Sequence, residues 1–273
     1  MSYYLKHYQN NLWHGKFAIF PPETVIHAIS TRQGGQSKKP FDSLNMALHV
    51  ADDESDVLAN RRLFAHSLGL DPRKIVTPNQ VHGAAVKRVT AADAGRGSLA
   101  YADAIPETDA LITDEPGLPL MLCFADCTPL MFFDPAHMAI GIAHAGWKGT
   151  VNKIGLKTVR RMSEEFGTDP AEVLAAIAPS IGACCYEVGE NVIEAARSAF
   201  ADRADELLSR RDGKTYFDLW QANRRTLLEA GLVETNIEMA NTCTSCEHQW
   251  YFSYRADGKD TGRIAAMMAI REI

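Results

Sequence analysis

The sequence predicts an α/β or α+β fold in which mixed β-sheets are flanked by helices, within a single domain spanning residues 1–273. The composition, 46% hydrophobic and 23% charged, is typical of a globular protein. Short apolar segments alternate with longer segments of helical periodicity, which indicates interleaved strands and helices. Several apolar segments follow one another too closely for helical crossovers, so antiparallel neighbours are expected as well.

One helix is expected early in the chain, over 53–70. Asp52 or Asp53 can cap its N-terminus, and apolar residues recur on one helical face. Gly69 and then Pro72 end it. Strands are expected at 24–30, 74–77 and 84–90, and a long surface loop at 91–106.

The middle and the end of the chain carry short segments in which nearly every residue is apolar. This pattern is typical of strands that are buried on both faces. The expected strands lie at 110–113, 118–124, 130–134, 138–144, 173–178, 236–241 and 263–270. The expected helices lie at 149–166, 190–200 and 219–230.

Charge and hydropathy exclude several classes of partner. The chain has 28 basic and 34 acidic residues, a net charge of −6, and lacks the dense positive charge that nucleic-acid binding needs. No stretch approaches the roughly 18 apolar residues of a membrane span, and the N-terminal segment has no secretory pattern. Six cysteines are too few for a disulfide scaffold. We therefore expect a cytoplasmic protein with no nucleic-acid or membrane partner.

Three polar residues stand at the ends of buried strands, beside glycine or proline turns: His82, Cys127 and His144. Loops on a rigid scaffold commonly carry catalytic groups. Two imidazoles and a thiolate suit Zn²⁺, and three protein ligands leave a fourth position for water. For each residue alone, simple core packing is the favoured interpretation, and their spacing matches no short metal motif. Together they favour a metal site.

The remaining cysteines give weaker indications. Cys243 and Cys246 form C-x-x-C, which is half of a zinc ribbon or a redox pair, but no second C-x-x-C completes a four-cysteine site. Cys184 and Cys185 are adjacent, a poor arrangement for chelation. We expect them to be packing or pocket-wall residues.

Several motifs occur in order from about residue 27 to the C-terminus. The longer ones are residues 79–83 (NQVHG), 125–129 (ADCTP), 143–149 (AHAGWKG) and 178–189 (APSIGACCYEVG), and shorter ones lie at 30–35, 43–45, 218–224, 252–255 and 261–263. Together they resemble the YfiH-type family, which is also labelled laccase-domain or multicopper polyphenol oxidoreductase.

The resemblance implies a layered fold like that of cytotoxic necrotizing factor and a zinc ion bound by His82, Cys127 and His144. It also implies phosphorolysis of adenosine, inosine and 5′-methylthioadenosine, together with deamination of adenosine. Purine nucleosides and phosphate would then be the substrates. Some bacterial members are linked instead to editing of cell-wall precursors.

The laccase label can be tested on the histidines. A four-copper centre needs about ten histidines, arranged largely as His-x-His pairs. This chain has nine histidines, and no two of them have that spacing. We therefore reject a four-copper centre and expect one zinc per chain, with copper as an alternative occupant of the three-ligand site.

Roles follow for other residues near these motifs. Asp126, next to the cysteine ligand, is a candidate proton shuttle for deamination, or else a turn-capping carboxylate. Arg32, in a glycine-rich turn, can bind phosphate through two hydrogen bonds, or is a surface residue. Trp147 can stack on a purine or belong to the core, and Asn45 or Gln80 can hydrogen-bond the base.

Two other hypotheses stay open. In a cysteine hydrolase or amidase, Cys127 would be the nucleophile, His144 the base, and Asp126 or Asn45 the orienting residue. A second imidazole, His82, is superfluous in that mechanism but required for a three-ligand metal site, which favours zinc. In the third hypothesis the chain binds metal or nucleoside without turnover.

Overall fold

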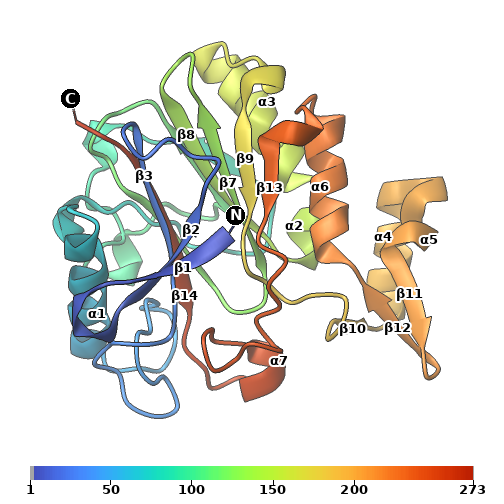
Figure 1. Cartoon of the computed structure of the whole chain (residues 1–273), viewed down its shortest axis with the longest axis horizontal. Helices are drawn as coiled ribbons and strands as arrows, with labels where there is room; N and C mark the ends of the chain where they lie inside the picture. The colour runs from blue at the N-terminus through green and yellow to red at the C-terminus, as the bar shows by residue number, and fades with distance from the viewer. Residues whose placement is uncertain (1–2, 273) are drawn as a thin grey trace.

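Two sheets stacked face to face form the centre of the computed structural model, which describes residues 3–272 (Figure 1). The first has the order β1 (Tyr3–His7), β2 (Trp13–Phe17), β3 (Val25–Ser30), β14 (Ile264–Ile270), β6 (Leu120–Phe124). The second has the order β13 (Ile237–Met239), β9 (Leu174–Ile177), β7 (Thr128–Asp134), β8 (Ala139–Ala145), β5 (Ala110–Thr113), β4 (Val86–Arg88). The second sheet mixes parallel pairs, β13–β9 and β4–β5, with antiparallel ones, as predicted.

Helices cover the outer face of each sheet, which makes four layers. Side chains of α1 (Glu54–Ser67) pack on the first sheet, and those of α3 (Ile154–Phe166) and α6 (Leu219–Glu229) pack on the second. Figure 1 shows α1 on one side of the paired sheets and α6 on the other. The inner faces share one core that includes Phe124 and Met268. The predicted fold class is therefore confirmed, and the central strands are apolar because both faces are buried.

A smaller group of elements lies beside this body, at the right of Figure 1. It consists of α4 (Glu190–Phe200), α5 (Ala204–Leu207) and a sheet of the order β10 (Glu187–Val188), β12 (Lys214–Phe217), β11 (Leu208–Arg211). Its apolar cluster includes Phe200, Leu207 and Phe217, with Trp147 of α2 (Trp147–Val151) packed against it. The last helix, α7 (Tyr254–Asp257), precedes β14. Short 3₁₀ turns lie at Gln9–Asn11, Pro72–Lys74, Ala91–Asp93, Tyr101–Asp103, Pro170–Glu172, Ala201–Arg203 and Glu234–Asn236.

Three expectations about elements need correction. The helix expected at 149–166 is two helices, α2 and α3, because Lys153 between them adopts a left-handed conformation (φ +57°). Of the strand expected at 74–77, only Val76 pairs, in a single bridge to Leu120. Strands β1, β2, β10, β11 and β12 were not anticipated. The Asp53 cap is confirmed, since its side chain accepts the Ser55 N–H at 2.8 Å.

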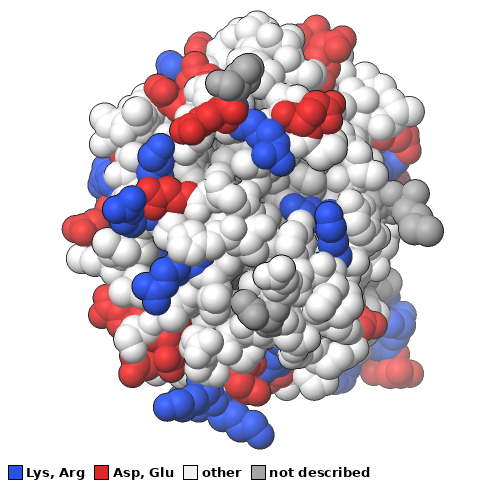
Figure 2. Space-filling model, turned by 60° about the vertical axis from the view of Figure 1, so that its left-hand side comes forward, with Lys and Arg blue, Asp and Glu red and all other residues white. Residues whose placement is uncertain are grey.

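The surface shows no segregation of charge on the face drawn in Figure 2, where basic and acidic side chains are interspersed. None of the described helices combines the length and the apolar character that a bilayer crossing requires. Of the domain expected at 1–273, residues 1, 2 and 273 lie outside the described part.

Candidate active site

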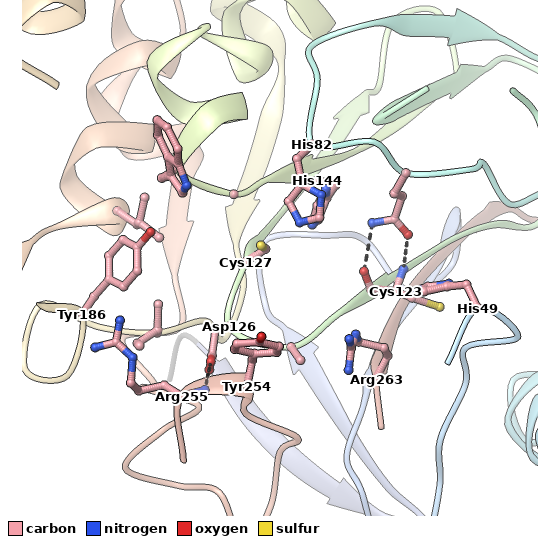
Figure 3. A pocket seen from close by; sticks show the side chains of 16 residues that line it. His49, His82, Cys123, Asp126, Cys127, His144, Tyr186, Tyr254, Arg255 and Arg263 are labelled. Atoms are coloured by element: carbon pink, nitrogen blue, oxygen red, sulfur yellow. Dashed lines mark hydrogen bonds between the residues drawn. The ribbon is translucent and has the colours of Figure 1, made fainter. Parts of the chain in front are cut away.

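The structure brings His82, Cys127 and His144 together, with their ligand atoms all within 4.8 Å of one another (Figure 3). Cys127 ends the turn between β6 and β7, and His144 lies near the end of β8, which pairs with β7. His82 lies in the loop before β4 with a left-handed backbone (φ +58°), and Asp126 also has a positive φ of +78°. Such conformations in residues other than glycine concentrate at functional sites.

One buried carboxylate, Asp109, connects two of these three residues. Its Oδ1 lies 2.9 Å from His144 Nδ1 and accepts the His82 N–H at 3.0 Å. Its Oδ2 accepts the N–H groups of Val81 at 3.2 Å and Gly83 at 2.7 Å. Because Nδ1 of His144 is bound here, Nε2 is left to face the cluster.

Sequence reasoning missed Asp109. The only signal was a carboxylate placed directly before the wholly buried strand β5, where an uncompensated charge would be costly. Burial by itself would raise the pKa of Asp109, but the hydrogen bond and charge of His144, together with the N–H groups of Gly83 and Val81, outweigh burial and lower it. The residue is fully buried and charged, which is tolerated because its oxygens are hydrogen-bonded.

Electrostatics favour a thiolate at Cys127. Burial by itself would raise the pKa of this thiol, but the neighbouring His144 and His82 lower it to about 6. Burial likewise acts to lower the pKa of His144, yet Cys127 and Asp109 raise it to about 9. The thiolate is the form that binds metals and attacks electrophiles, so this cluster is prepared for either chemistry.

Gly146 leaves room for the cluster. A Cβ atom at this position would lie 2.9 Å from Cys127 Sγ and 3.3 Å from His82 Cδ2. Gly146 itself has ordinary extended angles (φ −67°, ψ 175°) and caps α2. The absence of a side chain here is therefore required by the close approach of the cysteine and the histidine, not by the backbone.

The cluster opens into a cavity of about 470 Å³, a size suited to a small molecule. Aromatic and aliphatic side chains and several cations share its wall with the cluster. The lining residues are His49, Gln80, His82, Cys123, Ala125, Asp126, Cys127, His144, Gly146, Trp147, Ile181, Tyr186, Leu219, Tyr254, Arg255 and Arg263. Arg255 and Arg263 were missed as site residues, although both stand in motifs that carry the family resemblance.

Asp126 is the sole acidic residue that lines this cavity within the described part of the chain. Its carboxylate points toward Arg255 in Figure 3 and accepts the Arg255 N–H at 2.7 Å. The other oxygen accepts the Thr244 hydroxyl at 2.7 Å. Burial raises the pKa of Asp126 despite these hydrogen bonds. The residue therefore both ties two loops together and is disposed to hold a proton.

Gln80 and Trp147 line the cavity, as the sequence suggested. The amide group of Gln80 is already used, because it donates to the Cys123 carbonyl and accepts the Cys123 N–H, both at 2.9 Å (Figure 3). Gln80 thereby fixes the loop before His82 to the end of β6. Trp147 presents an aromatic surface with the Lys148 ammonium 5.6 Å from the ring centroid.

Arg32 and Asn45 are not brought to the cavity, which corrects the roles expected for them. The Arg32 guanidinium is bound by Asp257 at 3.2 Å and by the Asp42 carbonyl at 3.1 Å. The Asn45 amide donates to Asp52 at 2.8 Å, and its oxygen accepts the Arg263 N–H at 2.9 Å. Asn45 thus supports the backbone of a cavity residue. The residue that orients His144 is Asp109, and not Asn45 or Asp126 as the sequence suggested.

Comparison with known proteins places this site in a family. The model of the family described as multi-copper polyphenol oxidoreductase laccase matches residues 26–271. The chain belongs to this family. A crystal structure of YlmD from Geobacillus stearothermophilus superposes with a TM-score of 0.92 at 38% identity and covers 98% of this chain and 99% of that one. The YfiH-type resemblance is thereby confirmed.

Named relatives of this laccase-labelled family are nucleoside enzymes. A purine nucleoside phosphorylase YlmD from Geobacillus stearothermophilus is 41% identical over 251 residues, 91% of each chain. An adenosine deaminase RL5 from an unknown prokaryotic organism is 33% identical over 244 residues, covering 87% of this chain and 91% of the relative. The relatives are named as nucleoside enzymes, and this chain lacks the His-x-His pairs of a four-copper centre. The family is therefore not one of true laccases.

Proposed function

We propose that this chain is a zinc-dependent purine nucleoside enzyme. It would convert adenosine, inosine and 5′-methylthioadenosine to the free base and the corresponding ribose 1-phosphate, and deaminate adenosine to inosine. The observation that carries the proposal is the cluster of His82, Cys127 and His144 at the wall of a cavity sized for a nucleoside. The names of the relatives support the same substrate class.

The donor set fits zinc. Nitrogen and sulfur ligands suit Zn²⁺, and His144 presents its free Nε2 because Asp109 holds Nδ1. A thiol with a pKa near 6 is ionised at neutral pH, whereas His144, whose pKa is raised to about 9, has to release one proton when the metal binds. When bound, zinc supplies a Lewis acid that lowers the pKa of water to about 7.

Phosphorolysis breaks the C1′–N9 bond of the nucleoside and forms a C1′–oxygen bond to phosphate, while the base takes up a proton. The phosphate needs fixed cations, and Arg263 and Arg255 replace Arg32 in this role. The Arg263 guanidinium donates to the carbonyls of Thr261 and Gly262 at 2.6 and 2.9 Å, and no carboxylate pairs with it among residues 3–272. Its charge is therefore available to an anion in the cavity.

Deamination adds water at C6 and expels ammonia, so the site must move protons next to the ring. Asp126 is the acidic group available on the cavity wall, and its raised pKa suits a carboxyl that alternately holds and releases a proton. Trp147, Tyr186 and Tyr254 offer aromatic faces on which a purine can stack. The amide of Gln80 is bound to the Cys123 backbone, so Gln80 supports the cavity wall and does not hydrogen-bond the base.

The test follows adenosine by chromatography with and without phosphate, using the full chain and Cys127→Ala. We expect adenine only when phosphate is present and inosine in both conditions, with both activities lost in the variant. Cys123→Ala, which removes a buried thiol outside the cluster, is the matched control for zinc content. Full activity of zinc-free protein would contradict the proposal, and nucleoside binding without turnover would support the third hypothesis instead.

A cysteine hydrolase remains the second candidate because of one observation. Cys127, His144 and Asp109 form the thiol, imidazole and orienting carboxylate of a nucleophilic triad, with the pKa of the thiol lowered to about 6. Amides, including those of cell-wall precursors, would be its substrates. Saturation with zinc distinguishes the nucleoside enzyme from the hydrolase. In a zinc-dependent nucleoside enzyme, zinc should protect Cys127 from alkylation and promote nucleoside turnover. In a cysteine hydrolase, zinc should inhibit the cleavage of amides.

A further inference from the structure

Four cysteines outside the active site converge from two separate segments. Cys184 and Cys185 lie in the turn after β9, and Cys243 and Cys246 lie between β13 and α7. Their sulfur atoms are all within 4.8 Å of one another, with Cys246 Sγ 3.5 Å from that of Cys184 and 3.4 Å from that of Cys185. The adjacent pair, expected from sequence to chelate poorly, thus supplies the half that the single C-x-x-C lacks.

The distances match a ligand tetrahedron better than disulfides. Zinc–sulfur bonds of about 2.3 Å in a tetrahedron place the sulfur atoms about 3.8 Å apart. The sulfur separations here, from 3.4 Å upward and within 4.8 Å, bracket that value. A disulfide bond is about 2.05 Å long, so no pair is at bonding distance. Four thiolates without water or carboxylate make a closed site, which is typical of structural zinc.

A hydrogen-bond donor and two cations lie at the edge of the cluster. The Gly182 N–H donates to Cys243 Sγ at 3.2 Å, the kind of contact that supports a metal-bound sulfur. The Arg211 guanidinium donates to the Cys184 carbonyl at 3.3 Å, and that of Arg255 donates to the Cys185 carbonyl at 2.7 Å. These two cations lie next to a site that would carry a net charge of about −2 with zinc bound.

We propose that Cys184, Cys185, Cys243 and Cys246 bind a structural Zn²⁺ ion, distinct from the ion of the active site. The two segments already meet in a parallel bridge between Ser180 and Cys243. They continue into Tyr186 on one side and into Tyr254 and Arg255 on the other, all of which line the active-site cavity. The ion cross-links these segments and so fixes one wall of the cavity. Exposed Cys184 and Cys246 give the metal access from solvent.

Metal content of the full chain tests this directly. The protein is purified with reductant and zinc, desalted and measured by mass spectrometry. We expect about two zinc ions per wild-type chain, about one in Cys127→Ala, about one in Cys243→Ser/Cys246→Ser, and about two in the control Cys123→Ser. One ion in wild type and none in Cys127→Ala overturns the four-cysteine site and leaves the active-site zinc standing. One ion that survives Cys127→Ala but not the double change supports this site and contradicts the other.

Cobalt and thiol counts keep the test decisive if the double variant does not fold. Co²⁺ added to Cys127→Ala should give the strong visible absorption and the sulfur-to-cobalt charge transfer of a tetrahedral thiolate site, and Zn²⁺ should abolish both. Alkylation of denatured wild-type protein purified without reductant should find all six cysteines as thiols. A stable disulfide among the four, or cobalt spectra without thiolate bands, overturns the proposal.

Discussion

Asp109 holds both histidines of the proposed metal site, through the His144 ring and the His82 N–H, so the first residue-scale prediction concerns its charge. In Asp109→Asn, the NH2 group of the new side chain faces N–H donors in either orientation: those of Val81 and Gly83 in the position of Oδ2, or that of His82 beside the His144 ring in the position of Oδ1. We expect zinc affinity to fall about tenfold to a hundredfold. Competition with a chromogenic chelator measures it.

A second aspartate–histidine pair supplies the matched control for that change. Asp134 is also buried and lies 2.8 Å from Nδ1 of His137, but the pair does not line the cavity. Asp134→Asn should leave zinc affinity unchanged. Equal affinities of both variants and wild type would show that Asp109 has no positioning role.

Gly146 is the second residue whose replacement should act on the site alone. In Gly146→Ala, the new methyl group would lie 2.9 Å from Cys127 Sγ, and relieving such overpacking costs about 1–3 kcal/mol. That cost corresponds to roughly a tenfold to hundredfold loss of zinc affinity. Gly189, which caps α4 with similar angles (φ −88°, ψ 176°), is the control. If Gly189→Ala weakens zinc binding as much as Gly146→Ala does, the steric argument is wrong.

The sequence could predict the cluster but not its partners, for a physical reason. His82, Cys127 and His144 each end an apolar stretch at a turn, which is visible in one dimension. The link from Asp109 to His144 exists only because β5 and β8 pair, and a carboxylate carries no sign of its partner. Arg32 shows the converse, since a cation in a glycine-rich turn can bind phosphate or the nearby Asp257, and only the fold decides.

At the scale of elements, strand β14 is wholly apolar because both of its faces are buried. Met268 points into the core between the sheets, whereas Met267 packs on the side of α1. Met267→Ala and Met268→Ala should therefore each lower the free energy of unfolding by about 2–5 kcal/mol in urea titrations. Met239→Ala, on the half-buried edge strand β13, should cost less. A large loss at only one of the two central positions would mean that one face of β14 is not a true core.

Elements with strong patterns were predicted well and polar or broken ones were not. The helix expected at 190–200 and the strand expected at 110–113 coincide with α4 and β5. Strands β11 and β12 were not predicted because their exposed, charged residues show little alternation of apolar and polar side chains. The division between α2 and α3 was equally hidden, since nothing local forces Lys153 out of the helix. Its ammonium pairs with Glu229 of α6 at 2.7 Å, a contact that depends on the tertiary structure.

At the scale of the whole molecule, the first sheet combines strands from both ends of the chain with β6 from its middle. The last strand, β14, lies between β3 and β6, so the first sheet is complete only when the C-terminal residues are in place. Cys127 ends the turn that leads from β6 of this sheet to β7 of the other, and His144 belongs to β8, which pairs with β7. The active site therefore depends on the stacking of both sheets, and loss of global stability should remove metal binding together with the fold.

Global stability should depend on pH through two buried histidines, His14 on β2 and His27 on β3. Burial is the main cause that lowers the pKa of each from 6.5 to about 3, and the nearby Lys16 adds to it. The unfolded chain therefore binds protons that the native state does not. Stability is fully present above pH 6.5 and falls as the pH drops toward about 3, where the native histidines become protonated as well.

Replacing one of these histidines isolates its share. In His27→Gln, the new carboxamide can still accept the Phe17 N–H that His27 Nε2 accepts at 2.9 Å, but it does not titrate. The slope of the free energy of unfolding between about pH 4 and pH 6 should decrease by about 1.4 kcal/mol per pH unit. Urea titrations across this range measure the slope. An unchanged slope would mean that His27 is protonated alike in both states, and that burial on β3 does not keep it neutral.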